Sequence, residues 1–453
     1  MIKKSTNLIK KASKYIPGAS YYTAGQNVPG LPEFILDRGN GAYVYTTKNE
    51  KMLDVTLAHS SLILGHNNPK ISNAVKNQID KGSAFTNITE PAIELSEIMS
   101  KTIPCAEKIR LVNSGTEASI LATRIVRAYT GKNLILKFEG AYHGFADNLL
   151  FNTNYGNSKN WNDYPIPTPD SIGMPKTLNE EILIAPYNDL KQTKKIILKY
   201  RSEIAGIIIE PVMRGLETDQ SFLEGIRKIS SKENIPLIFD EVITGYRLSL
   251  GGAQEFFRIK PDIAIYGKAL GGGYPIGAIV GNEKIMNFLD PKSSDKNRIF
   301  SIGSFHSNPI SSIAALTCIS ELQNPQNYNK LNEFGDSLRA ELSHIFSQYK
   351  IPYFMTGTGS IVEFFFTSKS VLNYRDTLHT NLKLKSLLSI QLPKNFIVGG
   401  GGRFTSSIFH EKKELDWLLE GINNSLREIN SSGELEKSFE QNQDSLASAT
   451  KMG

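Results

Sequence analysis

The sequence has only two cysteines among its 453 residues, Cys105 and Cys318. They are far apart and form no CxxC pair, so the pattern predicts neither a disulfide framework nor a zinc site. Free thiols are typical of a reducing compartment, and we therefore expect a cytoplasmic protein. No apolar run approaches the roughly 20 residues of a membrane span, and the N-terminus lacks the apolar stretch of a secretory signal. We expect neither a membrane protein nor a secreted one.

The sequence also lacks a block of basic residues interleaved with aromatic ones. Its formal net charge of +6 comes from lysines scattered along the chain, with a small group near the N-terminus. A solvated, lysine-rich surface explains this distribution better than a nucleic-acid site does. We therefore expect no nucleic-acid partner, although the charge is compatible with a weak preference for anionic ligands.

What the chain does contain is a regular alternation of short apolar runs and longer helical stretches. This alternation predicts an α/β protein with a mostly parallel sheet. The nearly all-apolar runs are typical of strands that helices cover on both faces. Six such strands are expected, at 109–112, 134–138, 204–209, 237–239, 263–266 and 276–280.

A chain of this length favours two packed units. We predict a large unit over residues 61–309 and a smaller α+β unit over 310–430. Residues 1–60, with an expected hairpin turn at 39–41, are predicted to join the smaller unit. The polar segment 431–453 has few apolar residues, so we expect it to be disordered or loosely attached.

Small polar residues connect the first predicted strand directly to a helix, at Ser114, Gly115 and Thr116. Ser114 and Glu117 have the spacing of a capping box, in which both side chains accept hydrogen bonds at a helix start. The free N–H groups at a helix N-terminus also bind anions well. Taken alone, the motif fits either a plain helix cap or a site for an anionic group.

Three further strands end in residues that suit a ligand site. Residues 137–144 place Tyr142 and His143 between glycines, which fits either an ordinary turn or a ring presented to a flat ligand. Glu210 and Asp240 each follow an apolar strand, at the edge where open α/β sheets bind ligands. A buried Asp240 needs a cationic or hydrogen-bonding partner. A protonated pyridine nitrogen, a salt bridge and a helix cap all provide one.

Residues 262–278 are the most informative segment. A strand ends, Lys268 follows, and three glycines lead into the next strand. A solvated surface lysine is a poor explanation for this crowded position, whereas a desolvated lysine with a lowered pKa suits Schiff-base chemistry. Asp240 and Lys268 are 28 residues apart, the length of one helical crossover. Asp240 can then face the ring nitrogen of pyridoxal 5′-phosphate (PLP) while Lys268 faces its aldehyde carbon.

Together these motifs resemble the fold-type I, class III PLP-dependent enzymes, and most closely their glutamate-1-semialdehyde aminomutase branch. The resemblance covers roughly residues 15–430. The matching segments are 63–67, 113–118, 138–144, 210–211, 240–247, 267–273 and 303–309. The resemblance implies a mostly parallel seven-stranded sheet with a smaller α+β domain from both chain ends. It also implies PLP as cofactor, in its pyridoxamine form during part of the cycle.

The resemblance further implies a role for each matching residue. Lys268 forms the Schiff base with PLP and shuttles the proton during amino transfer. Asp240 pairs with the pyridine nitrogen, while Tyr142 and Val242 lie on opposite faces of the ring. The other implied cofactor contacts are Ser114, Gly115 and Thr116 around the phosphate, together with His143 and Glu210.

One implied contact comes from a neighbouring subunit. The family has a Gly-Thr pair that closes over the phosphate of the other subunit, and this chain has Gly303-Ser304 there, which keeps a hydroxyl. The next residues read His306-Ser307-Asn308-Pro309 in place of the family's Ser-Gly-Asn-Pro. We interpret His306 as a packing variant rather than as a new catalytic group. The resemblance thus implies a homodimer with shared active sites.

The N-terminal loop departs from the family pattern. The aminomutase branch has an arginine shortly after its Pro-Gly to bind the substrate carboxylate, whereas residues 17–26 contain none. The carboxylate clamp is therefore predicted to be lost or relocated. Hydroxylated or neutral substrates would suit the residues in its place, which are Ser20, Tyr21, Tyr22 and Gln26. Arg403 fits two interpretations, a replacement anion contact or a plain surface residue.

The leading hypothesis from the sequence is a PLP-dependent aminotransferase acting between a small-molecule amine or amino acid donor and an oxo acceptor. The alternative is an intramolecular aminomutase of the glutamate-1-semialdehyde type, with a PLP lyase as a third candidate. A non-catalytic binding protein is disfavoured, because Lys268, Asp240 and the phosphate-binding motif are all intact.

Overall fold

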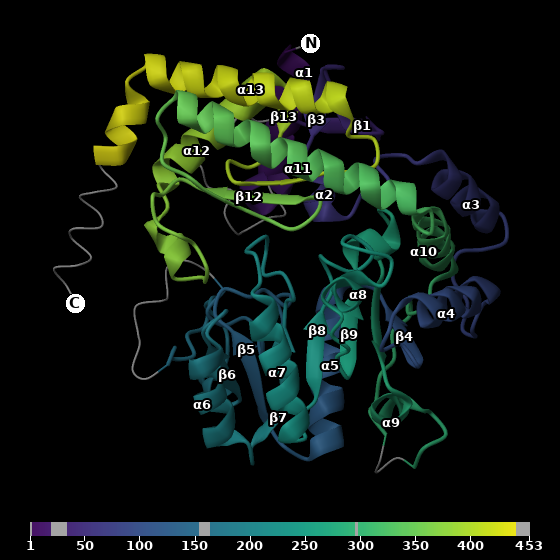
Figure 1. The fold of residues 1–453 in the computed structure, drawn as a ribbon. Helices are drawn as coiled ribbons and strands as arrows, with labels where there is room; N and C mark the ends of the chain where they lie inside the picture. The colour runs from purple at the N-terminus through teal and green to yellow at the C-terminus, as the bar shows by residue number, and fades with distance from the viewer. Residues whose placement is uncertain (1, 20–33, 154–163, 295–297, 441–453) are drawn as a thin grey trace.

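The computed structural model describes residues 2–19, 34–153, 164–294 and 298–440. These residues form two units, with a smaller one packed across the end of a larger one (Figure 1). Within the described ranges, no helix is long and apolar enough to cross a membrane. Both cysteines are buried free thiols.

The larger unit is built on a seven-stranded sheet with the order β4-β10-β9-β8-β7-β5-β6. Only β10 runs antiparallel to its neighbours, so the predicted mostly parallel sheet is confirmed. The prediction lacks β6, because four apolar residues are too short a run to identify a strand by periodicity. The strands are β4 Lys108–Val112, β5 Leu134–Phe138, β6 Ile182–Ala185, β7 Ile204–Ile209, β8 Leu237–Asp240, β9 Ile263–Tyr266 and β10 Gly277–Gly281.

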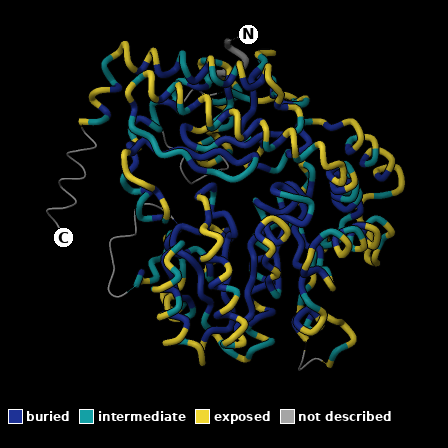
Figure 2. The backbone as a smooth tube through the Cα atoms, viewed as in Figure 1, coloured by how far each residue is buried: buried dark blue, intermediate teal, exposed yellow. Residues whose placement is uncertain are grey.

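Helices cover both faces of this sheet. Along β7, Ile207 and Ile209 enter one apolar core while Ile208 enters the core on the opposite face. The strands β6 to β10 are therefore buried along their whole length, in the dark blue interior of Figure 2, whereas the edge strand β4 is buried only at its last two residues. Burial on both faces explains the near-continuous apolar runs. The helices of this unit are α3 Pro69–Ile79, α4 Glu90–Thr102, α5 Gly115–Thr130, α6 Leu190–Tyr200, α7 Gln220–Lys232, α8 Gly252–Phe257 and α9 Glu283–Met286.

The smaller unit combines both ends of the chain. Its four-stranded sheet has the order β1-β2-β3-β13, and β13 (Ile397–Val398) pairs parallel with β3 (Lys51–Asp54). The expected hairpin is confirmed in β1 (Leu36–Asn40) and β2 (Tyr43–Thr46). The other elements of this unit or near it are α1 Ile2–Tyr15, α2 Leu57–Ser60, α11 Pro325–Gln348, β11 Phe354–Thr356, β12 Ile361–Phe365, α12 Leu382–Gln391, β14 Arg403–Thr405 and α13 Lys412–Ser431.

Two segments lie differently from the predicted organisation. Helix α10 (Pro309–Leu322) was placed in the smaller unit, but it packs on α3 and α4, and its Ala315 and Cys318 belong to the larger core. The polar tail was expected to be loose from residue 431, yet residues 434–440 are helical and Leu435 is buried against the smaller core. Phe439 packs against the same core, and Asn381 donates to the buried Ser438 hydroxyl at 3.0 Å, so apolar and polar contacts together hold this segment. Residues 441–453 lie outside the described part of the chain.

Candidate active site

Motifs far apart in sequence meet where the central strands of the larger sheet end. Gly267 follows β9, Val242 follows β8, and Gly115 begins α5. A Cβ atom on Gly115 would lie 2.9 Å from Val242 Cγ2, and one on Gly267 would lie 3.6 Å from the backbone nitrogen of Gly115. These glycines therefore let three chain segments approach closely. The structure brings together the parts that the sequence pattern predicted to share one edge of the sheet.

The N-terminus of α5 forms one wall of this site. Ser114 is its N-cap, and its side chain accepts a hydrogen bond from the backbone nitrogen of Glu117 at 3.2 Å. Gly144 lies directly against the Thr116 hydroxyl, since a Cβ on Gly144 would clash with it. The first N–H groups of a helix have no partner within the helix. This end of α5 therefore presents donors to an anionic group, within a small space that glycines keep open.

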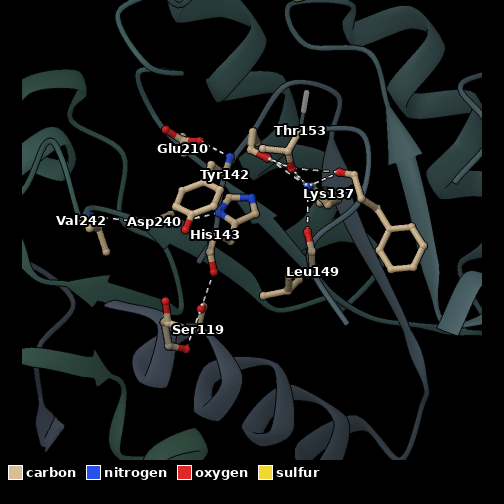
Figure 3. Close-up of polar contacts among 12 residues, drawn as sticks. Ser119, Lys137, Tyr142, His143, Leu149, Thr153, Glu210, Asp240 and Val242 are labelled. Atoms are coloured by element: carbon tan, nitrogen blue, oxygen red, sulfur yellow. Dashed lines mark hydrogen bonds and ion pairs between the residues drawn. The ribbon is translucent and has the colours of Figure 1, made fainter. Parts of the chain in front are cut away.

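Asp240, the last residue of β8, is 4 % exposed and is held by His143. Its Oδ2 lies 2.7 Å from Nδ1 of His143, and its Oδ1 accepts a hydrogen bond from the backbone nitrogen of Val242 (Figure 3). Nε2 of the buried His143 has no hydrogen-bond partner in the described structure. A carboxylate has about four acceptor sites, so Asp240 can still accept from a further donor such as a ring N–H.

The loop between β5 and residue 153 carries Tyr142 and His143 into the site. Glu210 is buried, and its Oε1 accepts a hydrogen bond from the backbone nitrogen of Tyr142 at 2.7 Å. The carbonyl of His143 accepts from the Ser119 hydroxyl on α5 at 2.6 Å. Glu210 therefore orients this loop, and the cofactor contact that the resemblance implies for it stays a prediction. Figure 3 shows these contacts together.

Lys268 begins a short 3₁₀ turn, η3 (Lys268–Gly271), directly after β9. It is partly buried and has a positive φ of 45°, an uncommon backbone conformation for a non-glycine residue. Such strained residues are frequent at active sites. Its amine forms no hydrogen bond or ion pair within the part of the chain that the structure describes. Burial lowers the pKa of Lys268 to about 8, although Glu210 and Asp240 attract its charge.

Two arginines, Arg403 and Arg214, lie near enough to Lys268 for their positive charges to lower its pKa further. Arg403 on β14 donates from Nε to Glu363 at 2.6 Å, and Lys385 contacts the other oxygen of that carboxylate. Arg214 has its guanidinium 5.7 Å from the centre of the Tyr142 ring. It forms no ion pair with any residue that the structure describes. Arg403 is therefore already paired, while Arg214 remains available to an anion.

Other predicted site residues lie elsewhere. Ser304 is exposed, as a residue that acts in a neighbouring subunit would be. His306 lies 3.3 Å from Glu117 in the first turn of α5, which is a surface contact beside the site. Ser20, Tyr21, Tyr22 and Gln26 lie outside the described residues.

Sequence reasoning missed three residues around the Tyr142 loop. Arg214 follows a turn with no motif to mark it, and Arg375 reaches Glu139 across 236 residues with a bidentate ion pair. Lys137 did carry a signal, since a lysine stands inside the otherwise apolar strand β5. A charged residue in a strand buried on both faces needs partners, and that requirement marks it as unusual.

Comparison with known proteins places this site in a family. The model of the family described as aminotransferase class III matches residues 23–426 of the chain. The chain belongs to the class III aminotransferase family.

Curated members of this family are similar over nearly their whole length. The chain is 39 % identical over 439 residues to the glutamate-1-semialdehyde 2,1-aminomutase of Wigglesworthia glossinidia brevipalpis, covering 93 % of this chain and 98 % of that relative. It is 36 % identical to the enzyme of that name from Fusobacterium nucleatum subsp. nucleatum, with coverages of 95 % and 98 %. Among solved structures, an omega-transaminase from Sphaerobacter thermophilus matches with a TM-score of 0.88 and 29 % identity, covering 93 % and 97 %.

The cofactor of class III aminotransferases is PLP, and the residues present fit it. The α5 N-terminus offers N–H donors for a phosphate, and glycines 115, 144 and 267 keep the adjacent space free of side chains. Asp240 offers a buried carboxylate for a pyridine nitrogen, and Lys268 offers an unpaired amine. These complementary groups all face one edge of the sheet.

The lowered pKa of Lys268 leads to a prediction about the pH dependence of PLP uptake, if this amine attaches the cofactor. Only the neutral amine attacks an aldehyde, and the pKa of Lys268 is lowered to about 8. We expect the rate at which the PLP-free enzyme captures PLP to rise with pH, to reach half its maximum near pH 8 and to level off roughly one unit above that. Stopped-flow absorbance measures this rate. A rate that continues to rise to pH 10, as for an ordinary lysine, would contradict the assignment.

Proposed function

We propose that this class III enzyme is an aminomutase, which moves an amino group between two carbons of one small, carboxylate-bearing substrate. The observation that carries the proposal is the convergence of Lys268, Asp240 and the unpaired Arg214 at one site. The curated relatives described above support it, since both are named glutamate-1-semialdehyde 2,1-aminomutase. This is the alternative of the sequence analysis. Its leading hypothesis, a two-substrate aminotransferase, has less support from these relatives.

Each residue of the site has a distinct task in this proposal. When bound, PLP supplies an electron-withdrawing ring that stabilises negative charge on the substrate carbon. Lys268 takes the proton from that carbon and returns it at the new position, a task suited to an amine with a pKa of about 8. Asp240, which His143 contacts at 2.7 Å, would hold the ring nitrogen. The phosphate would be held by Ser114, Gly115 and Thr116.

The substrate carboxylate has a candidate partner in Arg214. The N-terminal loop of this chain lacks the family's arginine, so another cation has to replace it. Arg214 is half-buried beside Tyr142 and has no competing carboxylate within the described structure. A planar guanidinium in this setting is suited to bidentate binding of a carboxylate. Arg403 is a weaker candidate, because Glu363 holds it.

Replacing Arg214 with glutamine should therefore weaken substrate binding selectively. Hydrogen bonds to charged groups contribute about 1.5–3 kcal/mol, so we expect KM for the carboxylate substrate to rise roughly 10- to 100-fold. PLP affinity should stay within a few-fold of wild type. The matched control is Arg201→Gln, because Arg201 is an exposed arginine at the far end of α6. An unchanged KM in Arg214→Gln would rule out this carboxylate contact.

The aminomutase proposal is tested with glutamate-1-semialdehyde as the only substrate. We expect many turnovers per site without any added amino donor or oxo acceptor, with the new position of the amino group read by NMR. An aminotransferase would stop after one half-reaction unless a second oxo substrate is present. That outcome would favour the two-substrate hypothesis and contradict the aminomutase.

We also propose that the enzyme is a homodimer whose active sites use Ser304 of the neighbouring subunit. Large apolar side chains surround Ser304 on the surface, and Phe300 and Ile302 are 74 % and 79 % exposed. The segment that carries the exposed Phe85 and Ile88 lies beside them, since Asn308 donates to the carbonyl of Ser83. Exposed apolar patches of this kind are typical of association surfaces.

Introducing negative charges into this apolar patch should dissociate the dimer. We expect Phe300→Glu combined with Phe305→Glu to yield monomers in analytical ultracentrifugation and to weaken PLP binding, because the phosphate loses a contact from the neighbouring subunit. Ile172→Glu is the control, since Ile172 is fully exposed but lies elsewhere. A wild-type monomer, or a dimer that persists in the double variant, would contradict the proposal.

A further inference from the structure

Lys137 is a fully buried lysine that no step of the proposed reaction uses. It lies on β5, and its Nζ is enclosed by four oxygen atoms (Figure 3). Three are backbone carbonyls, those of Ala141 at 3.0 Å, Leu149 at 3.0 Å and Phe151 at 2.5 Å. The fourth is the hydroxyl of Thr153 at 3.3 Å. We call these four oxygens the Lys137 cage.

Every atom of the cage belongs to the loop that carries Tyr142 and His143. Residues 139–153 fold back on themselves, and Lys137 is the donor at their centre (Figure 3). Buried backbone carbonyls are nearly always paired. Each of these carbonyls has a second donor, since the backbone nitrogen of Phe151 donates to Leu149 and the Thr153 hydroxyl donates to Ala141 and Phe151. Lys137 is the one donor that joins all three carbonyls, so its loss would remove the common centre of the loop.

The cage also fixes the orientation of one peptide group in the active site. The carbonyl of Ala141 belongs to the peptide bond whose N–H is that of Tyr142. Lys137 and the Thr153 hydroxyl both donate to the carbonyl end of this peptide at 3.0 Å, and Glu210 accepts from its N–H end at 2.7 Å. The plane of the peptide is thus held from both sides. The next residue, His143, contacts Asp240 at 2.7 Å, so its position follows from the same peptide.

A buried lysine has an energetic cost that argues for a specific task. Burial lowers the pKa of Lys137 to about 7, because desolvation outweighs the attraction of Asp170 and Glu210. An apolar residue at this position would avoid that cost, as the other residues of β5 do. An apolar residue, however, could not donate to these carbonyls. The lysine side chain reaches the centre of the loop with a four-carbon stem and places a donor there.

We propose that Lys137 is a positioning residue, which sets the Ala141–Tyr142 peptide and thereby places Tyr142 and His143 for PLP. This inference rests on the proposed function of the site. It assigns Lys137 no contact with substrate or cofactor.

The test compares three variants of the full-length enzyme. Lys137→Met keeps most of the stem but removes the donors. Thr153→Val removes one oxygen of the cage, together with the hydrogen bond of that hydroxyl to the Ala141 carbonyl, with little change in shape. Leu338→Ala creates a cavity in the core of the smaller unit and serves as a control for general destabilisation. The measurements are the melting temperature, the dissociation constant of PLP, and the hydrogen exchange of residues 139–153 in PLP-free protein.

We expect Lys137→Met to weaken PLP binding about tenfold or more and to speed exchange in residues 139–153 by a similar factor. Thr153→Val should shift both quantities in the same direction by less. Leu338→Ala should lower the melting temperature but leave both quantities near wild type.

Three results would overturn the inference. The first is a wild-type PLP affinity and exchange rate in Lys137→Met. The second is a loss in Leu338→Ala that matches the loss in Lys137→Met at equal melting temperature. The third, which decides the matter if Lys137→Met does not fold, is no change in Thr153→Val. A wild-type enzyme that binds no PLP would instead refute the proposed function, so the two failures are distinguishable.

Discussion

Replacing Lys268 with alanine should abolish both the covalent attachment of PLP and turnover, with a loss of activity of about 10⁴-fold or more. The amine attaches the cofactor and also moves the proton, and general acid–base catalysis alone contributes about 10²–10⁴-fold. The side chain forms no hydrogen bond or ion pair with the described residues, so its loss leaves no partner unsatisfied. The melting temperature should therefore change little.

The measurement is the visible absorbance of lysine-bound PLP together with kcat/KM. Lys268→Arg is an informative companion, since it keeps a positive charge but cannot form the same covalent bond. Lys108→Ala removes an exposed lysine on β4 and should behave as wild type. An active Lys268→Ala enzyme with the wild-type absorbance would show that another residue attaches PLP and moves the proton.

Replacing Asp240 with asparagine should reduce kcat/KM by about 10²–10³-fold while PLP still binds. A preorganised buried charge contributes this much when it stabilises charge that develops during reaction. Asp240 is nearly inaccessible to water, and His143 and the backbone of Val242 hold both of its oxygens. Asparagine fits the same space but cannot stabilise a protonated ring nitrogen.

Asp262→Asn is the matched control, because Asp262 is also next to a central strand but pairs with Arg227 away from the site. It should retain wild-type kinetics, and both variants should keep their far-ultraviolet circular dichroism. Kinetics of Asp240→Asn within a few-fold of wild type would mean that the ring nitrogen is not paired with this carboxylate.

The sequence predicted the sheet and the placement of Asp240 and Lys268 at one edge of it, because both leave local signals. Apolar strands covered on both faces read as continuous apolar runs, and Asp240 and Lys268 follow two of them directly. Since β8 and β9 are neighbours in the sheet, one helical crossover brings the two residues together. Local spacing and strand order together were sufficient for this part of the site.

Contacts between distant segments were not predictable in the same way. Lys137 gains its role only because residues 139–153 fold over it, and nothing in the spacing of that loop shows where its carbonyls point. The hydrogen bond from the backbone of Tyr142 to Glu210 joins residues 68 positions apart, and no local pattern marks it either. Arg403 pairs with Glu363, which is 40 residues away in the sequence. The sequence alone therefore does not show that Arg403 already has a carboxylate partner.

The central claim, that Lys268 is the residue that attaches PLP, is tested most directly by reducing the PLP-bound enzyme with borohydride and mapping the modified peptide by mass spectrometry. Lys268 and Lys137 are the two lysines in the described structure whose pKa values are strongly lowered, to about 8 and about 7. The structure predicts the label on Lys268 alone, because its amine is unpaired whereas that of Lys137 is enclosed by its cage. A label on Lys137, or none on Lys268, would contradict the account.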